Sequence, residues 1–70
     1  MDFNDKEIIK LAKYLKHWAD HNESHNQSLL KWSEIAKKRG LETVAEKINK
    51  AIEMMEKSSE YLLSAQKELK

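Results

Sequence analysis

The only glycine of the chain, Gly40, separates two long stretches in which mostly apolar residues recur in alternating steps of three and four. We call each such row a seam. This spacing is typical of helices that pack against other helices. The expected seam of the first stretch consists of Ile8, Leu11, Leu15, Trp18, Asn22, His25, Leu29, Trp32 and Ala36. That of the second consists of Leu41, Ala45, Ile48, Ile52, Met55, Ser59, Leu62, Gln66 and Leu69. Because the chain has no proline and is 36% charged, it offers little material for strands, and we expect an all-α protein.

A first helix is expected over residues 5–39. Asn4 suits the N-cap position, Glu7 would close a capping box, and Phe3 would pack on Ile8 as a hydrophobic staple.

The seam keeps its phase through the polar segment 20–24, which favours one continuous helix. Ser24 and Gln27 could instead form a second capping box. That alternative would split the segment and give a three-helix bundle.

Gly40 follows three cations at 37–39, which suit the negative end of a helix, so it is expected to be the left-handed residue that ends the first helix. A second helix is expected over 42–69, with Thr43 and Glu46 as its capping box. Two long helices joined by so short a turn must lie antiparallel.

Folding the chain about Gly40 pairs positions whose numbers add to roughly eighty, because both helices rise equally per residue. Asn22 then faces the neighbourhood of Ser59, and His25 that of Glu56. We therefore predict a single helical-hairpin domain over residues 1–70.

Two helices alone make a thin core, because a chain of 70 residues buries a small share of its surface. The absence of cysteine excludes disulfides and thiolate sites. Oligomerisation, a metal held by nitrogen or oxygen ligands, and very regular helix packing remain as stabilising devices. Apolar residues that flank the seams widen each stripe: Ile9, Tyr14, Leu30, Met54 and Leu63. We expect a homodimer that forms a four-helix bundle.

All three histidines, His17, His21 and His25, are spaced four residues apart. On a helix such residues lie one turn apart on one face, so neighbouring imidazoles can converge on one ion. His25 is expected in the seam and His21 at its border, which makes them the better pair. His17 is expected outside the seam, as a third ligand or a second site. Glu56 and Glu60 are expected at the right height on the second helix to complete the metal site.

Other interpretations of these residues stay open. The histidines could be satisfied polar groups in a bundle seam, or a pH switch, since protonated imidazoles one turn apart repel. Trp18 and Trp32 are expected to pack in the core. Asn22 could fix the register of the helices.

Charge excludes some partners. Thirteen Lys and Arg against twelve Asp and Glu give a net charge of +1, so the lysines at 6, 10, 13 and 16 form a solvated face rather than a nucleic-acid site. No apolar run approaches the length of a membrane span or a signal peptide, and we expect a soluble, cytoplasmic protein. No nucleophile has a convincing base and a hairpin offers no deep pocket, so we expect no enzyme.

The segment His17-Trp18-x-x-His21-Asn22-x-x-His25, with Lys31-Trp32 and the turn that begins at Gly40, resembles a family of small uncharacterised prokaryotic helical-hairpin domains with an HWxxHNxxH motif. The similarity runs from about Leu11 to Leu69. The resemblance implies a metal-binding role, in transition-metal handling such as nickel supply, with the three histidines as ligands. It also implies a metal-handling protein as a further partner.

The sequence therefore predicts a non-enzymatic protein that holds nickel, zinc or copper through its histidines. The alternative is a structural or protein-interaction module without a metal.

Overall fold

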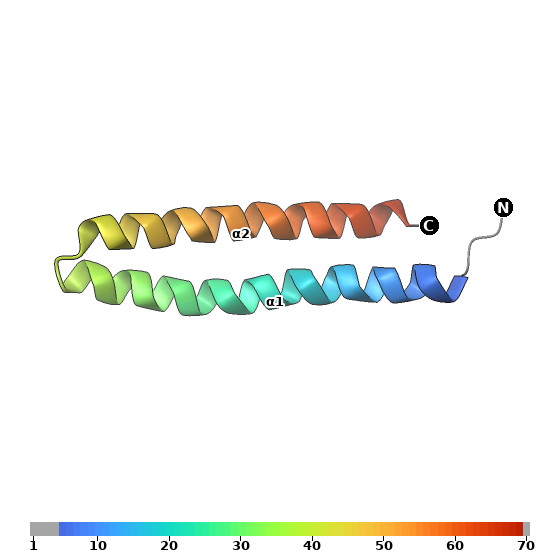
Figure 1. The fold of residues 1–70 in the computed structure, drawn as a ribbon, viewed down its shortest axis with the longest axis horizontal. Helices are drawn as coiled ribbons and strands as arrows, with labels where there is room; N and C mark the ends of the chain where they lie inside the picture. Colours follow the sequence, from blue (N-terminus) through green and yellow to red (C-terminus); the bar gives the residue numbers. More distant parts are fainter. Residues whose placement is uncertain (1–4, 70) are drawn as a thin grey trace.

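The computed structural model describes residues 5–69, which form two helices. Helix α1 spans Asp5–Lys38 and helix α2 spans Glu42–Glu68. The helices run antiparallel and side by side, and the first turns of α1 extend past the C-terminal end of α2 (Figure 1). The described part of the chain contains no strand, so the predicted all-α class and two-helix hairpin are confirmed.

Helix α1 is continuous through residues 20–25, so the three-helix alternative is wrong. It begins at Asp5, as the sequence predicts, and ends one residue before the predicted end. Acidic residues in its first turn and lysines in its last complement the helix dipole. The roles predicted for Phe3 and Asn4 fall outside the described residues.

The turn is closed by a Schellman motif around Gly40, which has a φ of 78°. The N–H of Leu41 donates to the carbonyl of Ala36 at 2.9 Å, and that of Gly40 to the carbonyl of Lys37 at 3.1 Å. Leu41 then serves as the N-cap of α2 without a side-chain cap. The predicted capping box at Thr43 is therefore wrong, because the Schellman turn leads directly into the helix.

The seam of α1 differs from the predicted one at every second position. Buried or half-buried residues of α1 recur as Ile8, Ala12, Leu15, Ala19, Asn22, Asn26, Leu29, Ser33 and Ala36, and Ile35 beside them is half-buried as well. The small residues at 12, 19, 26 and 33 replace the predicted large ones at 11, 18, 25 and 32, all of which are exposed. In α2 the predicted seam is observed from Ala45 onward, whereas Leu41 is exposed.

Large residues of α2 explain why the small ones of α1 face inward. Ile48, Ile52, Met55 and Leu62 fill the space between the helices, and bulky side chains from both helices would force them apart. The buried apolar residues are accordingly few: Leu15, Ala19, Ala36 and Ala45.

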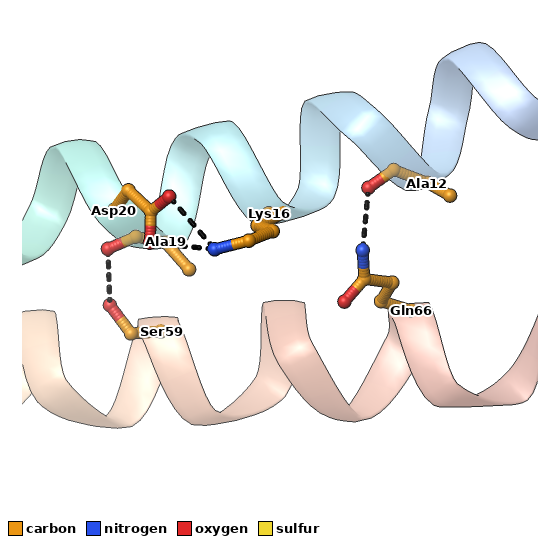
Figure 2. A network of polar contacts seen from close by, with 6 residues as sticks. All are labelled: Ala12, Lys16, Ala19, Asp20, Ser59 and Gln66. Atoms are coloured by element: carbon orange, nitrogen blue, oxygen red, sulfur yellow. Dashed lines mark hydrogen bonds and ion pairs between the residues drawn. The ribbon is translucent and has the colours of Figure 1, made fainter.

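Polar side chains cross the seam between the apolar layers. Gln66 donates to the carbonyl of Ala12 at 3.0 Å, and Ser59 to that of Ala19 at 3.4 Å (Figure 2). The methyl side chains of both alanines leave these carbonyls within reach. Such bonds satisfy polar groups that the seam would otherwise bury unpaired.

Candidate metal centre

The three histidines lie on consecutive turns of α1, and all three are exposed. The Nε2 atoms of His21 and His25 are 2.9 Å apart, and their rings are almost perpendicular, at 88° with centroids 4.4 Å apart. The rings of His17 and His21 are nearly parallel, at 20°, with centroids 6.2 Å apart. The helix therefore brings His21 and His25 together as a pair, with His17 beside them.

The His21–His25 pair can do one of two things. With both rings neutral, one Nε2–H donates to the other Nε2, and which ring donates depends on the tautomers. Alternatively, both Nε2 lone pairs can bind one metal ion.

His17 points into different surroundings. It lines a shallow groove with Lys13, Lys16 and Asp20. Lys16 and Asp20 form an exposed ion pair at 3.1 Å (Figure 2). Asp20 is thus engaged by a lysine one turn before it.

His25 lies outside the seam, contrary to the sequence prediction, because Asn26 takes the buried position. Asn22 lies in the seam as predicted, half-buried, and it donates from Nδ2 to Oγ of Ser58 at 3.4 Å, one residue from the predicted neighbour Ser59. The histidine pair is consequently on the outer surface of the hairpin, next to the edge that Asn22 and Ser58 form.

Glu56 and Glu60 are placed away from this edge. Ser33, on the other side of the α1 seam, donates to Oδ1 of Asn49 at 2.7 Å, which marks the opposite edge of the hairpin. Glu56 follows Asn49 by seven residues, so it shares that edge, and Glu60 follows one turn later.

Residues 5–69 contain no group of three or more His, Asp or Glu side chains placed to hold a metal ion. The roles of Glu56 and Glu60 as ligands therefore stay a prediction. One chain presents imidazoles, without those carboxylates, on the outer face.

Aromatic side chains precede and follow the histidine pair along α1. Tyr14 and Trp18 stack at 5.7 Å and 11°, and the ammonium of Lys10 lies 5.8 Å from the Tyr14 centroid. Trp18 and Trp32 are 46% and 57% exposed, so their predicted place in the core is wrong. The sequence does contain a sign that the tryptophans are exposed. Both share a heptad position with His25, and each precedes by one residue a small residue that packs inward.

No helix in the described part of the chain is both long and apolar enough to cross a membrane.

Comparison with known proteins places the chain in a family. A family model described as a domain of unknown function, DUF8180, matches residues 11–69. The chain belongs to the DUF8180 family. The DUF8180 match spans most of both helices, including the three histidines and the turn at Gly40, and agrees with the extent of the resemblance in the sequence. No curated protein and no solved structure matches the chain significantly.

Proposed function

We propose that this hairpin is a non-enzymatic metal-binding protein that holds a divalent transition metal ion through His21 and His25. The 2.9 Å separation of their Nε2 atoms is the observation that carries the proposal. Imidazole nitrogens are common ligands for nickel, copper and zinc.

The separation agrees with the geometry of two bonds to one ion. Two metal–nitrogen bonds of about 2.05 Å that meet at a right angle place their nitrogens about 2.9 Å apart, whereas a tetrahedral angle requires about 3.3 Å. Both angles lie within a small movement of the two exposed rings, so the pair suits nickel, cupric copper or zinc.

The proposed protein acts as a homodimer, a four-helix bundle made of two hairpins. The exposed aromatic residues on either side of the histidines support a dimer. Covering them with a second hairpin would remove water from the site and strengthen the bonds between the imidazoles and the metal ion.

Calorimetric titration with nickel, zinc and copper tests the metal site. We expect His21→Ala and His25→Ala each to reduce nickel affinity at least about tenfold. This is the lower end of the loss in affinity that follows removal of a group that orients a metal ligand. His17→Ala is the matched control on the same helix and should change affinity less. Equal, weak affinity of the parent and both variants would refute the proposal.

A second titration addresses the carboxylates. The structure places Glu56 and Glu60 at the opposite edge, so Glu56→Ala and Glu60→Ala should leave the affinity unchanged. A loss comparable to that of His21→Ala would instead make them ligands, as the sequence predicts.

A protein-interaction module without a metal is the second candidate. The exposure of Trp18, Trp32 and Tyr61, the last at 77%, favours it, because large apolar groups gathered on one surface mark interaction sites. It would be supported if the chain associates and binds no metal.

A further inference from the structure

Helix α1 carries a second set of residues in steps of three and four, all exposed, and each precedes a residue of the buried seam by one position. We call this set the outer seam: Leu11, Tyr14, Trp18, His21, His25, Ser28 and Trp32. Steps of this kind are what a helix uses to pack on another helix. Since α2 already occupies the inner seam, the outer seam is available for a second partner.

The outer seam continues onto α2. The Asn22–Ser58 bond shows that Ser58 lies on the same side of the hairpin as the outer seam. Exposed residues in steps of three and four share that side of α2: Val44, Lys47, Ala51, Met54, Ser58, Tyr61 and Ala65. The hairpin therefore has one broad, weakly charged face that spans both helices.

The opposite face has a different character. The Ser33–Asn49 bond marks it, and three large apolar residues, Ile9, Leu30 and Leu63, are exposed there. Its other exposed positions are mostly charged: Lys16, Glu23, Lys37, Glu46, Glu53 and Glu60. Charged residues are depleted at the centre of protein interfaces, so this face is the poorer docking surface.

We propose that a second copy of the chain covers the outer seam, with α1 antiparallel to α1, so that His21 and His25 of both copies form one four-imidazole metal site. This inference rests on the proposed function, whose ligand pair it completes. A pair of ligands from one chain leaves the remaining coordination positions of the ion open.

The order of residues along the outer seam supports a second copy as the occupant. In an antiparallel helix pair, alternate seam positions lie opposite each other. We place the two-fold axis of the proposed dimer midway between His21 and His25. His21 of each copy then lies opposite His25 of the other copy. The same axis sets Trp18 against Ser28 and Trp32 against Tyr14. Each bulky tryptophan thus meets a smaller or flat side chain, and the four histidines lie in two adjacent layers.

The exposed residues of α2 show the same symmetry independently. The Asn22–Ser58 bond puts the level of the proposed axis near residues 57 and 58 of α2. Met54 and Tyr61 lie at equal distances on either side of that level. Met54 of each copy therefore meets Tyr61 of the other copy. Lys47 and Glu68 are related in the same way, which adds a pair of opposite charges on each side of the axis.

The apolar area is of the order that a dimer needs. Tyr14, Trp18, Trp32 and Tyr61 are between 43% and 77% exposed. At about 150–250 Å² per aromatic side chain, these four contribute roughly 300–600 Å². A specific interface buries on the order of 800 Å² per partner, so the remaining residues of the face need supply only the balance.

Nickel titration followed by analytical ultracentrifugation tests the proposal. We expect one nickel ion per two chains and a dimer in the nickel-bound state. One ion per chain on a monomer would overturn this inference and the proposed homodimer, while leaving the proposed metal binding through His21 and His25 intact. No binding at all would refute both.

Two exposed residues on opposite faces give a matched pair of variants. Trp18→Ala should raise the dimer dissociation constant at least about tenfold, as buried tryptophans at interfaces do. Leu30→Ala on the charged face should leave it unchanged. Circular dichroism checks that both variants stay helical, and equal effects of the two would contradict docking through the outer seam.

Single cysteines test the direction of docking, because the chain has none of its own. Ser58→Cys lies beside the axis and should form a disulfide with its own copy upon oxidation. Ala65→Cys, one heptad later on the same face of α2, should not, because a residue that far from the axis lies roughly 20 Å from its copy along the helix, at about 1.5 Å per residue. A disulfide from Ala65→Cys would show parallel docking and overturn the arrangement.

Discussion

Asn26 lies in the seam between the helices at 8% exposure, and its Oδ1 has no hydrogen-bond partner. A buried polar atom without a partner costs about 1–3 kcal/mol. Ser33, one heptad later, solves the same problem, because its hydroxyl donates to Asn49 at 2.7 Å. The two residues occupy equivalent seam positions and should respond oppositely to truncation.

We therefore predict that Asn26→Ala raises the free energy of unfolding by about 1 kcal/mol, since alanine fits this seam position at 12 and 19 and removes the unpaired acceptor. Ser33→Ala should lower it by a similar amount because it leaves Asn49 without its donor. Urea unfolding without metal at one fixed protein concentration measures both. A decrease in the free energy of unfolding for Asn26→Ala would show that the Asn26 amide makes a hydrogen bond that stabilises the seam.

At the scale of the helices, the distance between α1 and α2 depends on the small residues of α1. Ala19 is 4% exposed, and its carbonyl accepts the Ser59 hydroxyl. Ala12 similarly leaves its carbonyl open to Gln66. A larger side chain at either alanine would separate the helices and break these bonds.

Ala19→Leu is predicted to lower the free energy of unfolding by about 1–3 kcal/mol, the usual cost of overpacking. Gln27→Leu introduces a leucine at an exposed position of the same helix and should have little effect. Urea unfolding of both variants provides the comparison. An Ala19→Leu variant as stable as the parent would mean that the helices pack through the residues at 11, 18, 25 and 32 instead.

The sequence predicts the elements of this hairpin better than their rotation. Continuous heptad phase and the lone Gly40 suffice for two helices and their turn, because both are local signals. They cannot decide between Trp18 and Ala19 as the inward residue, since a shift by one position preserves the spacing. That choice depends on the large side chains of the other helix.

The same distinction applies to the candidate site. His21 and His25 are paired by spacing within one helix, so the sequence predicts their proximity. The predicted contribution of Glu56 depended on the rotation of α1, which places His25 on the outer face instead. A ligand from a facing helix is therefore predicted only as well as the seam is.

The turn offers a further prediction at this scale. Nothing lies within 4 Å of a Cβ built on Gly40, so a substitution there meets no steric clash outside the backbone. Gly40→Ala should nevertheless lower the free energy of unfolding by about 1–2 kcal/mol, because its φ of 78° disfavours other L-residues. Gly40→Asn should lose less, since asparagine tolerates this conformation. Thermal unfolding followed by circular dichroism compares the three, and equal stability would contradict a left-handed turn.

At the scale of the whole molecule, the hairpin is 58 Å long but only 14 by 12 Å across its Cα atoms. None of the described side chains is completely buried. So thin a core supplies little stability on its own. Association and metal binding would both add stability through mass action, and the two contributions can be separated.

The midpoint of thermal unfolding should rise by about 5–10 °C when the protein concentration rises a hundredfold, because a dimer gains RT ln 100 from mass action. Excess nickel should raise it further in the parent. His21→Ala should lose the nickel-dependent part and keep the concentration-dependent part, whereas Trp18→Ala should lose most of the latter. The contrary result is an unfolding midpoint that does not depend on protein concentration in either the metal-free or the nickel-loaded parent. It would show that the hairpin is stable as a monomer and that its outer seam does not stabilise it through a second copy.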